Sequence, residues 1–391
     1  MSQAQPQAAL PGAAAASGPD PDPRFYLCPT DWVRGPASAA AIAAGVALPL
    51  AGGDLAFQSI CVGWRQAEGA AYCRLPVDRS SRADLVAWAE NVGWAVGWTE
   101  QLAALTEPRQ TALAGACGTV PRIMGVINVT PDSFSDGGLF LDPAAAIVEG
   151  RAMAAAGAGI LDIGGESTRP GAAPVPAAEE ARRVTPVIAG LVGSGPSLSV
   201  DTRRAAVMAA AVAAGADLIN DVSALTGDDD SLAVAADSDC PVILMHMQGT
   251  PVDMQEDPRY HFAPFDIFDW LQGRLAACAM VGIPAARVIT DPGFGFGKTV
   301  AHNLQILSWL GVFQALGCPV VAGLSRKSSI AKIASPHAPD ALPASRRLPG
   351  SLAFALAAAA RGADILRVHD VAETAQALAI WRATESGVPS V

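Results

Sequence analysis

The chain has 391 residues, of which 51% are apolar, and a formal net charge of −11 at pH 7. This length accommodates one large domain and one smaller domain. No apolar run approaches the roughly 18–20 residues of a membrane span, and no charged segment followed by an apolar core begins the chain, so we expect neither a membrane association nor a secretory signal. The acidic balance disfavours a nucleic-acid partner.

The seven cysteines are dispersed along the chain, and no two of them have CxxC spacing. An odd, scattered set without an export signal predicts reduced thiols and a cytoplasmic protein. The sequence also contains no HExxH motif and no Cys/His cluster that would indicate a zinc site.

The N-terminal part of the chain divides into a tail and a small module. Residues 1–23 contain almost no large apolar side chains, so they cannot bury enough surface to offset the entropy of ordering. Residues 24–118 contain most of the tryptophans, β-like runs at Leu55–Trp64 and Ala71–Val77, and a capped helical turn at Ser81–Trp88. We predict a disordered tail over 1–23 and a small α/β module over 24–118.

From residue 120 onward, strand patterns alternate with helix patterns. Eight apolar runs are predicted as strands, namely Ile123–Thr130, Ile160–Gly164, Leu198–Asp201, Leu218–Asp221, Val242–His246, Val288–Asp291, Val320–Ser325 and Ile365–His369. Helix patterns separate these strands. One of them has Asp142 as its N-cap, begins at Pro143 and ends at Ala156-Gly157. Eight such units predict a (β/α)8 barrel of the TIM type over residues 119–391. A doubly wound α/β sheet is the alternative, although such sheets rarely need eight uniform units.

Nearly every predicted strand ends at a polar side chain. These residues are Asn128, Asp162, Asp201, Asn220 with Asp221, His246, Asp291, Ser325 with Arg326 and Lys327, and Arg367 with His369. An Asp after a strand is a helix cap about as often as it is a site residue. A lone His such as His246 is more often a packed residue than a catalyst. The whole set is harder to explain in that way, because a packed barrel needs no polar groups at so many strand ends. Carboxylates and amides suit the edge of a heterocycle and the cations suit a phosphate, so we predict a phosphorylated heterocycle as ligand.

Loops at the same end of the barrel are predicted to cover this site. Two loops, Thr130–Phe140 and Gly164–Gly171, are rich in glycine and polar residues, which is typical of mobile covering loops. The alternative interpretation is that both are ordinary turns. The connections 247–262 and 326–349 are unusually long for loops between a strand and a helix, which is common at functional sites.

The segment Gly293–Thr299 resembles two nucleotide-binding motifs without matching either. A P-loop requires Gly where Pro292 stands, and a dinucleotide-binding fingerprint requires Gly where Lys298 stands. We therefore assign no nucleotide site to this segment.

Eight segments jointly resemble dihydropteroate synthases of the pterin-binding family. They are Gly125–Gly138, Asp162–Gly171, Ser199–Thr202, Ile219–Ser223, Met245–Gly249, Asp291–Gly297, Gly323–Ser328 and Arg367–Glu373. The resemblance implies a transferase of folate biosynthesis and a sulfonamide target. It would condense 7,8-dihydropterin-6-ylmethyl diphosphate with p-aminobenzoate and release pyrophosphate. It also implies Mg²⁺ as cofactor and a homodimer.

The resemblance assigns roles to individual residues. Asp201, Asn220, Asp291 and Lys327 would hold the pterin ring, with Met245 and Phe296 packed nearby. Asn128, Arg367 and His369 would hold the diphosphate, with Asn128 as the Mg²⁺ contact. Gly323, Lys327 and Ser328 would border the p-aminobenzoate site, and Asp136, Thr168 and Arg169 would come from the two covering loops. The residues assigned to catalysis are Asp136, Arg169, Asp201 and Lys327.

Two other functions stay open at this point. One is a pterin-dependent methyltransferase on a similar barrel, against which Arg367 and His369 argue because methyl transfer releases no diphosphate. The other is a catalytically silent pterin-binding protein, which would typically lack the loop or anion-binding residues. On the synthase reading, replacing Arg367 with alanine is expected to weaken diphosphate binding and to leave the fold intact.

Overall fold

The computed structural model describes residues 24–66, 69–77, 87, 95–113, 120–130, 142–167, 174–251, 253–338, 340 and 342–386. The tail predicted over 1–23 lies outside these ranges, as does the helical turn at Ser81–Trp88 except for Ala87.

Eight parallel strands form the barrel. They are β5 (Arg122–Asn128), β6 (Ile160–Gly164), β7 (Ser197–Asp201), β8 (Leu218–Asp221), β9 (Val242–Met245), β10 (Val288–Asp291), β11 (Val321–Ala322) and β12 (Ile365–Val368). Each strand pairs with its neighbour in sequence from β5 to β10, and β12 pairs with both β11 and β5. A single parallel bridge between Thr290 and Val320 joins β10 to the start of β11. The predicted (β/α)8 barrel is therefore confirmed, and the doubly wound alternative is wrong.

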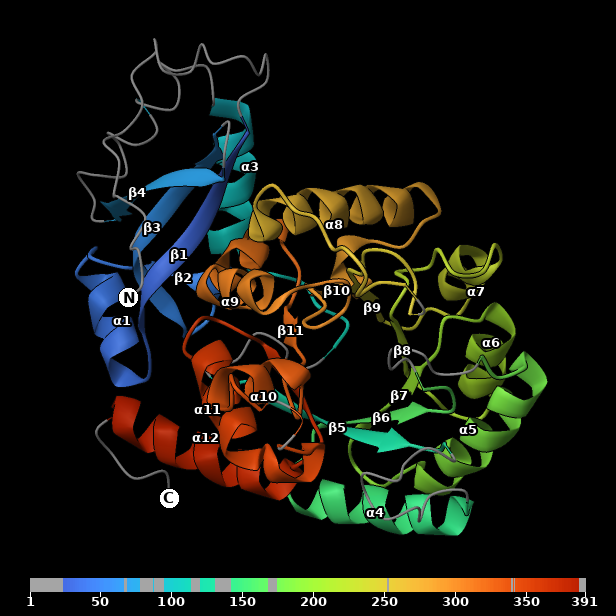
Figure 1. The fold of residues 1–391 in the computed structure, drawn as a ribbon. Helices are drawn as coiled ribbons and strands as arrows, with labels where there is room; N and C mark the ends of the chain where they lie inside the picture. The colour runs from blue at the N-terminus through green and yellow to red at the C-terminus, as the bar shows by residue number, and fades with distance from the viewer. Residues whose placement is uncertain are drawn as a thin grey trace.

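Helices surround the barrel on its outer side (Figure 1). They are α4 (Pro143–Ala155), α5 (Ala177–Leu191), α6 (Ala205–Ala213), α7 (Ser231–Asp237), α8 (Ala263–Met280), α9 (Val300–Ser308), α10 (Ser328–Ala334), α11 (Leu348–Ala359) and α12 (Val371–Ser386), with 3-10 helices η4 (Ala285–Arg287), η5 (Leu310–Leu316) and η7 (Ala344–Arg346). The predicted start of α4 is confirmed, because the Asp142 carboxylate accepts a hydrogen bond from the backbone N–H of Ala144. Among the helices that the structure describes, none has the length and apolarity needed to cross a membrane.

The inward-facing positions change from apolar to polar along several strands. The lowest layer is a buried apolar cluster of Leu113, Met124, Ile160, Leu218, Ile243, Ile289, Val321 and Ile365. Because side chains alternate between the two faces of a strand, the next inward positions lie two residues further on. On β6, β8 and β10 these are Asp162, Asn220 and Asp291, all buried. The barrel is thus packed at its N-terminal end and polar towards its C-terminal end.

Strand β11 is shorter than the predicted Val320–Ser325, because only Val321 and Ala322 remain in the sheet. Beyond Ala322 the hydrogen bond between the two chain segments involves a side chain, because the backbone N–H of His369 donates to the Ser325 hydroxyl oxygen at 3.2 Å. The connection 326–349 was expected to be a loop, but α10 and η7 interrupt it.

The described part of the N-terminal module contains an antiparallel sheet and the helices α1 and α3. Its elements are β1 (Phe25–Val33), α1 (Pro36–Ala43), β2 (Leu48–Pro49), the 3-10 helix η2 (Leu50–Gly52), β3 (Ala56–Arg65), β4 (Ala70–Pro76) and α3 (Ala95–Thr106). Strand β3 pairs with β1, β2 and β4. The two predicted β-like runs correspond to β3 and β4, so these predictions are confirmed.

The module packs against the side of the barrel next to α8 and η5 (Figure 1). Tyr26 stacks on Phe265 of α8 with ring centroids 3.9 Å apart, and its hydroxyl donates to Asp269. Strand β3 approaches so closely that a Cβ at Gly63 would lie 2.5 Å from the Phe265 ring, which requires glycine at this position. Arg34 donates to the carbonyl oxygen of Ala359 at 2.9 Å. These contacts join the module and the barrel into one packed unit.

Candidate active site

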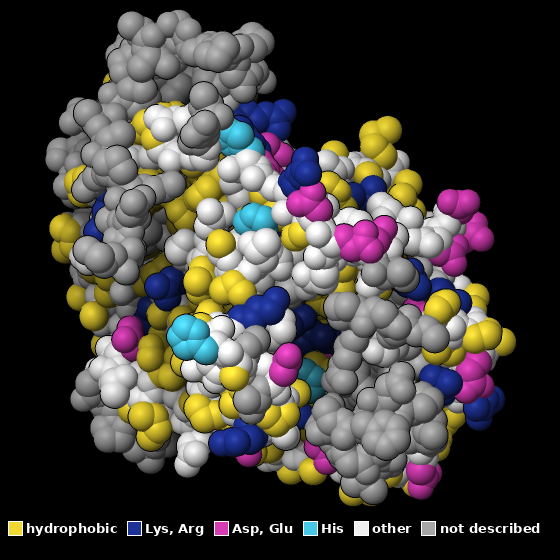
Figure 2. Space-filling view, viewed as in Figure 1, with side chains coloured by type: hydrophobic (Ala, Val, Ile, Leu, Met, Phe, Trp, Pro, Cys, Tyr) yellow, Lys and Arg dark blue, Asp and Glu magenta, His cyan; other side chains and the backbone are white. Residues whose placement is uncertain are grey.

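A cavity of about 510 Å³ opens at the C-terminal ends of the strands. Eight of the residues expected in the site line it, namely Asn128, Asp201, Phe296, Gly323, Lys327, Ser328, Arg367 and His369. Figure 2 shows Lys and Arg side chains gathered around a hollow near the middle of this face. The cavity also receives Met254 from the connection 247–262 and Arg347 from 326–349, so both long connections reach the site as predicted.

The other expected site residues fall into two groups. Asn220, Met245 and Asp291 are at most 6% exposed and lie outside the lining of this cavity. Asp136, Thr168 and Arg169 lie outside the residues that the structure describes.

Arg367 lies between two carboxylates at the floor of the cavity. Its Nε donates to Asp162 at 2.7 Å, and its Nη2 donates to Asp201 at 2.6 Å. Asp162 is fully buried and also accepts hydrogen bonds from Ser199 at 2.6 Å and from Asn220 at 3.1 Å. The network fixes the direction of the Asp201 carboxylate, whose side chain remains 12% exposed towards the cavity.

Burial raises the pKa of two carboxyl groups in the site. Desolvation and the nearby Asp162 charge raise the pKa of Asp201 to about 7, although Arg367 pulls it downwards. Burial also raises the pKa of Asp291, against a hydrogen bond from the Gly293 N–H and the charge of Lys327. In both groups burial opposes ionisation, and the neighbouring cation or hydrogen-bond donor favours it.

Lys327 and Phe296 face each other across the cavity wall. The Lys327 ammonium nitrogen lies 4.1 Å from the centroid of the Phe296 ring, which is the geometry of a cation–π contact. Both residues line the cavity. Together they provide a flat apolar surface beside a positive charge, which suits an electron-rich planar heterocycle.

His369 and Ser325 form a second polar edge of the cavity. The Ser325 hydroxyl oxygen lies 3.0 Å from His369 Nδ1 and also accepts the hydrogen bond from the His369 backbone N–H. Arg326 is held by Asp370 through two hydrogen bonds, of 2.6 and 3.1 Å. Cations and hydroxyl groups of this kind suit phosphate oxygens.

The glycine-rich segment Gly293–Thr299 is a wall of the site and not a phosphate loop. Gly293 has a φ of +69°, and a Cβ there would lie 2.0 Å from the carbonyl oxygen of His246. At Gly297 a Cβ would lie 2.4 Å from the carbonyl oxygen of Gln248. Glycine is therefore required where this segment passes against the end of β9.

Lys298 holds this wall from behind. Lys298 is 3% exposed, and its ammonium group donates to the carbonyl oxygen of Phe296 at 2.8 Å and to Nδ1 of His246 at 3.0 Å. Burial and the Lys298 charge hold the pKa of His246 well below its usual range. The interpretation of His246 as a packed residue is thus supported. The structural role of Lys298 was not predicted, because no local sequence pattern indicates it.

Several lining residues were missing from the expected set. Lys332 and Arg347 add cations to the lining, and Glu166, within the loop Gly164–Gly171, adds a carboxylate. Glu166 is 8% exposed and accepts hydrogen bonds from Arg203 and Arg204. The alternation of a strand could not reveal these residues, because they lie on loops and helices.

The described residues contain no group of three or more His, Cys, Asp or Glu side chains that would hold a metal alone. The top of β6 nevertheless offers oxygen donors. A Cβ at Gly164 would occupy a space within 4 Å of both Asn128 Oδ1 and Asp201 Oδ2, and glycine leaves this space open. Mg²⁺ prefers oxygen ligands and is commonly held by one or two protein groups together with substrate phosphates. This donor set fits Mg²⁺ that arrives with a diphosphate.

The geometry combines a carboxylate and amide floor, a cationic rim and one aromatic wall. Such a cavity binds a heterocycle through its hydrogen-bonding edge and a diphosphate through the rim. Among the lining residues, the Ser325 hydroxyl oxygen lies beside a histidine, 3.0 Å from His369 Nδ1, as the hydroxyl of a nucleophile would. The Ser325 oxygen, however, accepts from the backbone and serves to orient His369.

A family model described as "Pterin binding enzyme" matches residues 124–369. The chain is 45% identical over 268 residues to a dihydropteroate synthase of Neisseria meningitidis serogroup B, which covers 67% of this chain and 92% of the relative. It is 43% identical over 267 residues to the Escherichia coli K12 dihydropteroate synthase, covering 68% of this chain and 92% of that one.

Solved structures agree with these relatives. The Yersinia pestis dihydropteroate synthase with a sulfonamide drug has a TM-score of 0.65 and 45% identity, and the match covers 68% of this chain and 95% of that one. The Xanthomonas albilineans enzyme in complex with 7,8-dihydropteroate has a TM-score of 0.60 and 47% identity, over 68% of this chain and 94% of that one. The family match, the relatives and the structures cover the same barrel, and the chain therefore belongs to the pterin binding enzyme family, among its dihydropteroate synthases.

Proposed function

We propose that the cavity condenses 7,8-dihydropterin-6-ylmethyl diphosphate with p-aminobenzoate, giving 7,8-dihydropteroate and pyrophosphate. The observation that carries this proposal is the pairing of Arg367 with Asp162 and Asp201, because it fixes a carboxylate where a pterin edge would lie. The Xanthomonas albilineans relative has been solved with 4-aminobenzoic acid and with 7,8-dihydropteroate, which supports the same substrates here.

The pterin ring would lie against Phe296, with its N–H donors directed to Asp201 and Asp291. Asn220 supports this edge from below through its hydrogen bond to Asp162, and Met245 is buried below the same edge. Lys327 contributes a charge above the ring plane that offsets the buried carboxylates.

The diphosphate would lie across the top of β5 and β12. Asn128 would hold Mg²⁺, which when bound offsets negative charge on the phosphate oxygens. His369, oriented by Ser325, and the edge of Arg367 that faces the cavity would contact the same group. Asp136, Thr168 and Arg169 are proposed to complete the site from the covering loops.

The chemical step requires little acid–base chemistry from the chain. Cleavage of the bond between the pterin methylene carbon and the diphosphate oxygen leaves positive charge on the pterin. Asp201 and Asp291 face that charge, whereas Arg367 and His369 face the departing pyrophosphate, so fixed charges stabilise both products of the cleavage. The amine nitrogen of p-aminobenzoate, held beside Ser328 and Gly323, then forms the new bond to the methylene carbon and releases one proton to solvent.

The test of this function is identification of the product. Purified protein mixed with both substrates and Mg²⁺ should form 7,8-dihydropteroate, detected by liquid chromatography and mass spectrometry. Binding of the pterin without any condensed product would instead indicate the catalytically silent alternative. Transfer of a methyl group from a methylated pterin to a corrinoid acceptor would indicate the methyltransferase alternative.

Pterin affinity is expected to fall as the pH drops below about 7. The pKa of Asp201 is raised from 3.8 to about 7, so acidification removes the charge that accepts hydrogen bonds from the pterin. Titration calorimetry between pH 5.5 and 8.5 should show affinity declining up to about tenfold per pH unit on the acidic side. Asp201→Asn should bind weakly at all of these pH values, and a wild-type profile without an inflection would contradict the assignment.

The same pKa shift has the opposite effect on folding. Because folded Asp201 binds a proton more tightly than unfolded Asp201, this group makes folding less favourable as the pH rises from about 4 to 7. A pH-dependent loss of affinity on acidification therefore cannot be attributed to unfolding caused by this residue.

Removal of Mg²⁺ should stop turnover and leave pterin-ring binding intact. Asn128 would supply one oxygen ligand, and the remaining ligands would come from the diphosphate and water, so a chelator should remove the ion readily. Activity should be lost with excess EDTA and return with Mg²⁺. Binding of a pterin that lacks the diphosphate should not change, and loss of that binding as well would place the ion in a structural role.

We also propose that two copies associate through helices of the barrel. Ile333 on α10 is 46% exposed, which is unusual for a large apolar side chain and supports an apolar contact surface there. Sedimentation analysis should give a dimer, and a monomer at all concentrations would contradict this.

A further inference from the structure

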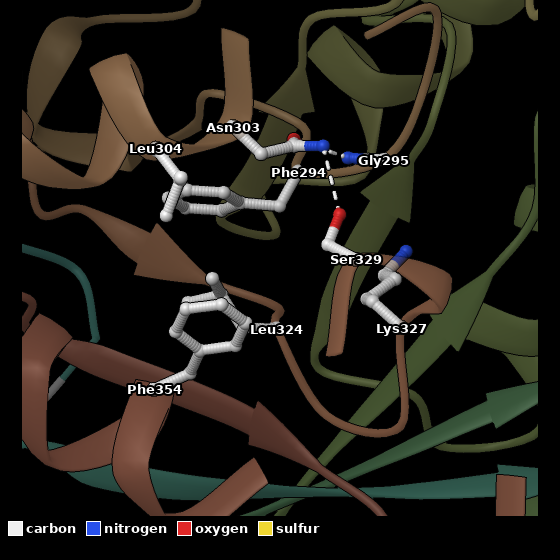
Figure 3. A pocket seen from close by; sticks show the side chains of 8 residues that line it. All are labelled: Phe294, Gly295, Asn303, Leu304, Leu324, Lys327, Ser329 and Phe354. Carbon is white, nitrogen blue, oxygen red and sulfur yellow. Dashed lines mark hydrogen bonds between the residues drawn. The ribbon is translucent and has the colours of Figure 1, made fainter. Parts of the chain in front are cut away.

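The side chain of Asn303 lies between the two loops that carry Phe296 and Lys327. Asn303 is on α9, behind the cavity wall, and does not line the substrate cavity. Figure 3 shows its carboxamide directed at Gly295 on one side and at Ser329 on the other.

All three hydrogen-bonding functions of this carboxamide are used within the protein. Its Oδ1 accepts from the backbone N–H of Gly295 at 2.8 Å. Its Nδ2 donates to the Ser329 hydroxyl oxygen at 3.2 Å and to the carbonyl oxygen of Thr299 at 2.9 Å. Asn303 is 5% exposed and Ser329 is 7% exposed, so water cannot readily replace these partners.

Each end of this bridge lies next to a substrate-binding side chain. Gly295 immediately precedes Phe296, and Ser329 follows Lys327 by two residues at the start of α10. The two loops also touch directly, because a Cβ at Gly295 would lie 3.3 Å from Cδ of Lys327. The 4.1 Å contact between the Lys327 ammonium and the Phe296 ring thus joins the same two loops that Asn303 bridges.

We propose that Asn303 is a positioning residue that couples the loop after β10 to the loop after β11. Through Ser329 it fixes the distance between Phe296 and Lys327, and with it the width of the slot that receives the pterin ring and the p-aminobenzoate beside Ser328. This role rests on the proposed function, because the two loops matter to catalysis only if they hold these substrates.

Apart from Lys327, the side chains around the bridge are apolar, so an unpaired group there would be costly. Phe294, Leu324 and Phe354 line a space of about 10 Å³ beside it, together with Leu304. A space this small and apolar holds no water network that could substitute for the carboxamide. Loss of Asn303 leaves the Gly295 N–H without its acceptor, and the loop is expected to shift to find another.

The kinetic test compares three single variants and one double variant in the full-length protein. Asn303→Ala and Ser329→Ala should each raise the KM for p-aminobenzoate about fivefold to tenfold, the equivalent of one lost hydrogen bond, with a smaller change in kcat. The double variant should be no worse than Asn303→Ala alone, because both changes break the same link. Leu304→Ala is the control, since it removes a side chain from the same small space and from the same helix but no polar link.

Hydrogen–deuterium exchange gives a readout that does not need activity. Asn303→Ala should speed exchange both in the peptide that contains 293–299 and in the peptide that contains 326–333. Ser329→Ala should speed exchange in the same two peptides, but more weakly. Leu304→Ala should leave both peptides protected.

The outcomes separate the coupling from the proposed function. Faster exchange in only one of the two peptides, or fully additive KM changes, would overturn the coupling. Correlated exchange in a wild-type protein that forms no dihydropteroate would sustain the coupling and overturn the proposed substrates instead.

Discussion

Arg367→Ala is expected to lower the free energy of unfolding by about 3–5 kcal/mol, because it breaks a buried ion-pair network by removing one partner. Asp162 is fully buried and Asp201 nearly so, and Arg367 is the cation between them. Without it the two carboxylates repel each other and Asp201 loses its fixed direction, so kcat/KM should fall about 100-fold. Urea denaturation and steady-state kinetics measure the two effects.

The control for this variant is Arg361→Ala, which removes an exposed arginine whose guanidinium donates to the backbone of its own helix. It should change stability by less than about 0.5 kcal/mol and leave turnover unaltered. A wild-type denaturation midpoint for Arg367→Ala would contradict the ion-pair network. From the sequence alone, this substitution was expected to weaken diphosphate binding and to leave the fold intact. The ion pairs seen in the structure predict a loss of stability as well.

Removal of the N-terminal module should destabilise the barrel severely. We propose that residues 1–23, 24–118 and 119–391 are the units of the chain, but the second and third do not behave as independent domains. A fragment of residues 119–391 would expose Phe265 and Trp309, which the module now helps to bury. We expect this fragment to aggregate or to melt at least 10 °C below the full chain. This decrease corresponds to the largest destabilisation that the loss of buried aromatic contacts causes.

Point variants test the same contact without truncation. Tyr26→Ala should cost about 3–5 kcal/mol, since Tyr26 is 1% exposed and stacks on Phe265. Tyr26→Phe keeps the stacked ring and loses the hydrogen bonds of the hydroxyl with Asp269 and Arg65, so it should cost about 1–2 kcal/mol. A truncated chain with the full melting temperature, together with a neutral Tyr26→Ala, would show that the module is an independent appendage.

The barrel could be predicted from the sequence because its signals are local. Each strand is a short apolar run, and each helix begins or ends at a recognisable residue, as Asp142 and Gly157 do around α4. The polar strand ends followed from the alternation of side chains, which places Arg367 and His369 on the inner face together. Strand β11 was predicted too long because the replacement of its ladder by Ser325 depends on a residue 44 positions away.

The pairings inside the site could not be predicted in this way. Arg367 and Asp162 are 205 positions apart, and no sequence pattern indicates that an arginine expected at a diphosphate also holds two carboxylates. Lys298 was considered only as a departure from a nucleotide motif, yet it is a buried support of the Phe296 wall. Asn303 drew no attention, because its importance comes from lying between two loops that are distant from each other in sequence.

The most direct test of the central claim is steady-state release of pyrophosphate with and without p-aminobenzoate. The full-length protein, supplied with the pterin diphosphate and Mg²⁺, should release one pyrophosphate for each dihydropteroate formed. Sustained release should require the arylamine, and Lys327→Ala should lose it. Pyrophosphate release at the same steady rate without p-aminobenzoate, or no release with both substrates present, would contradict the account.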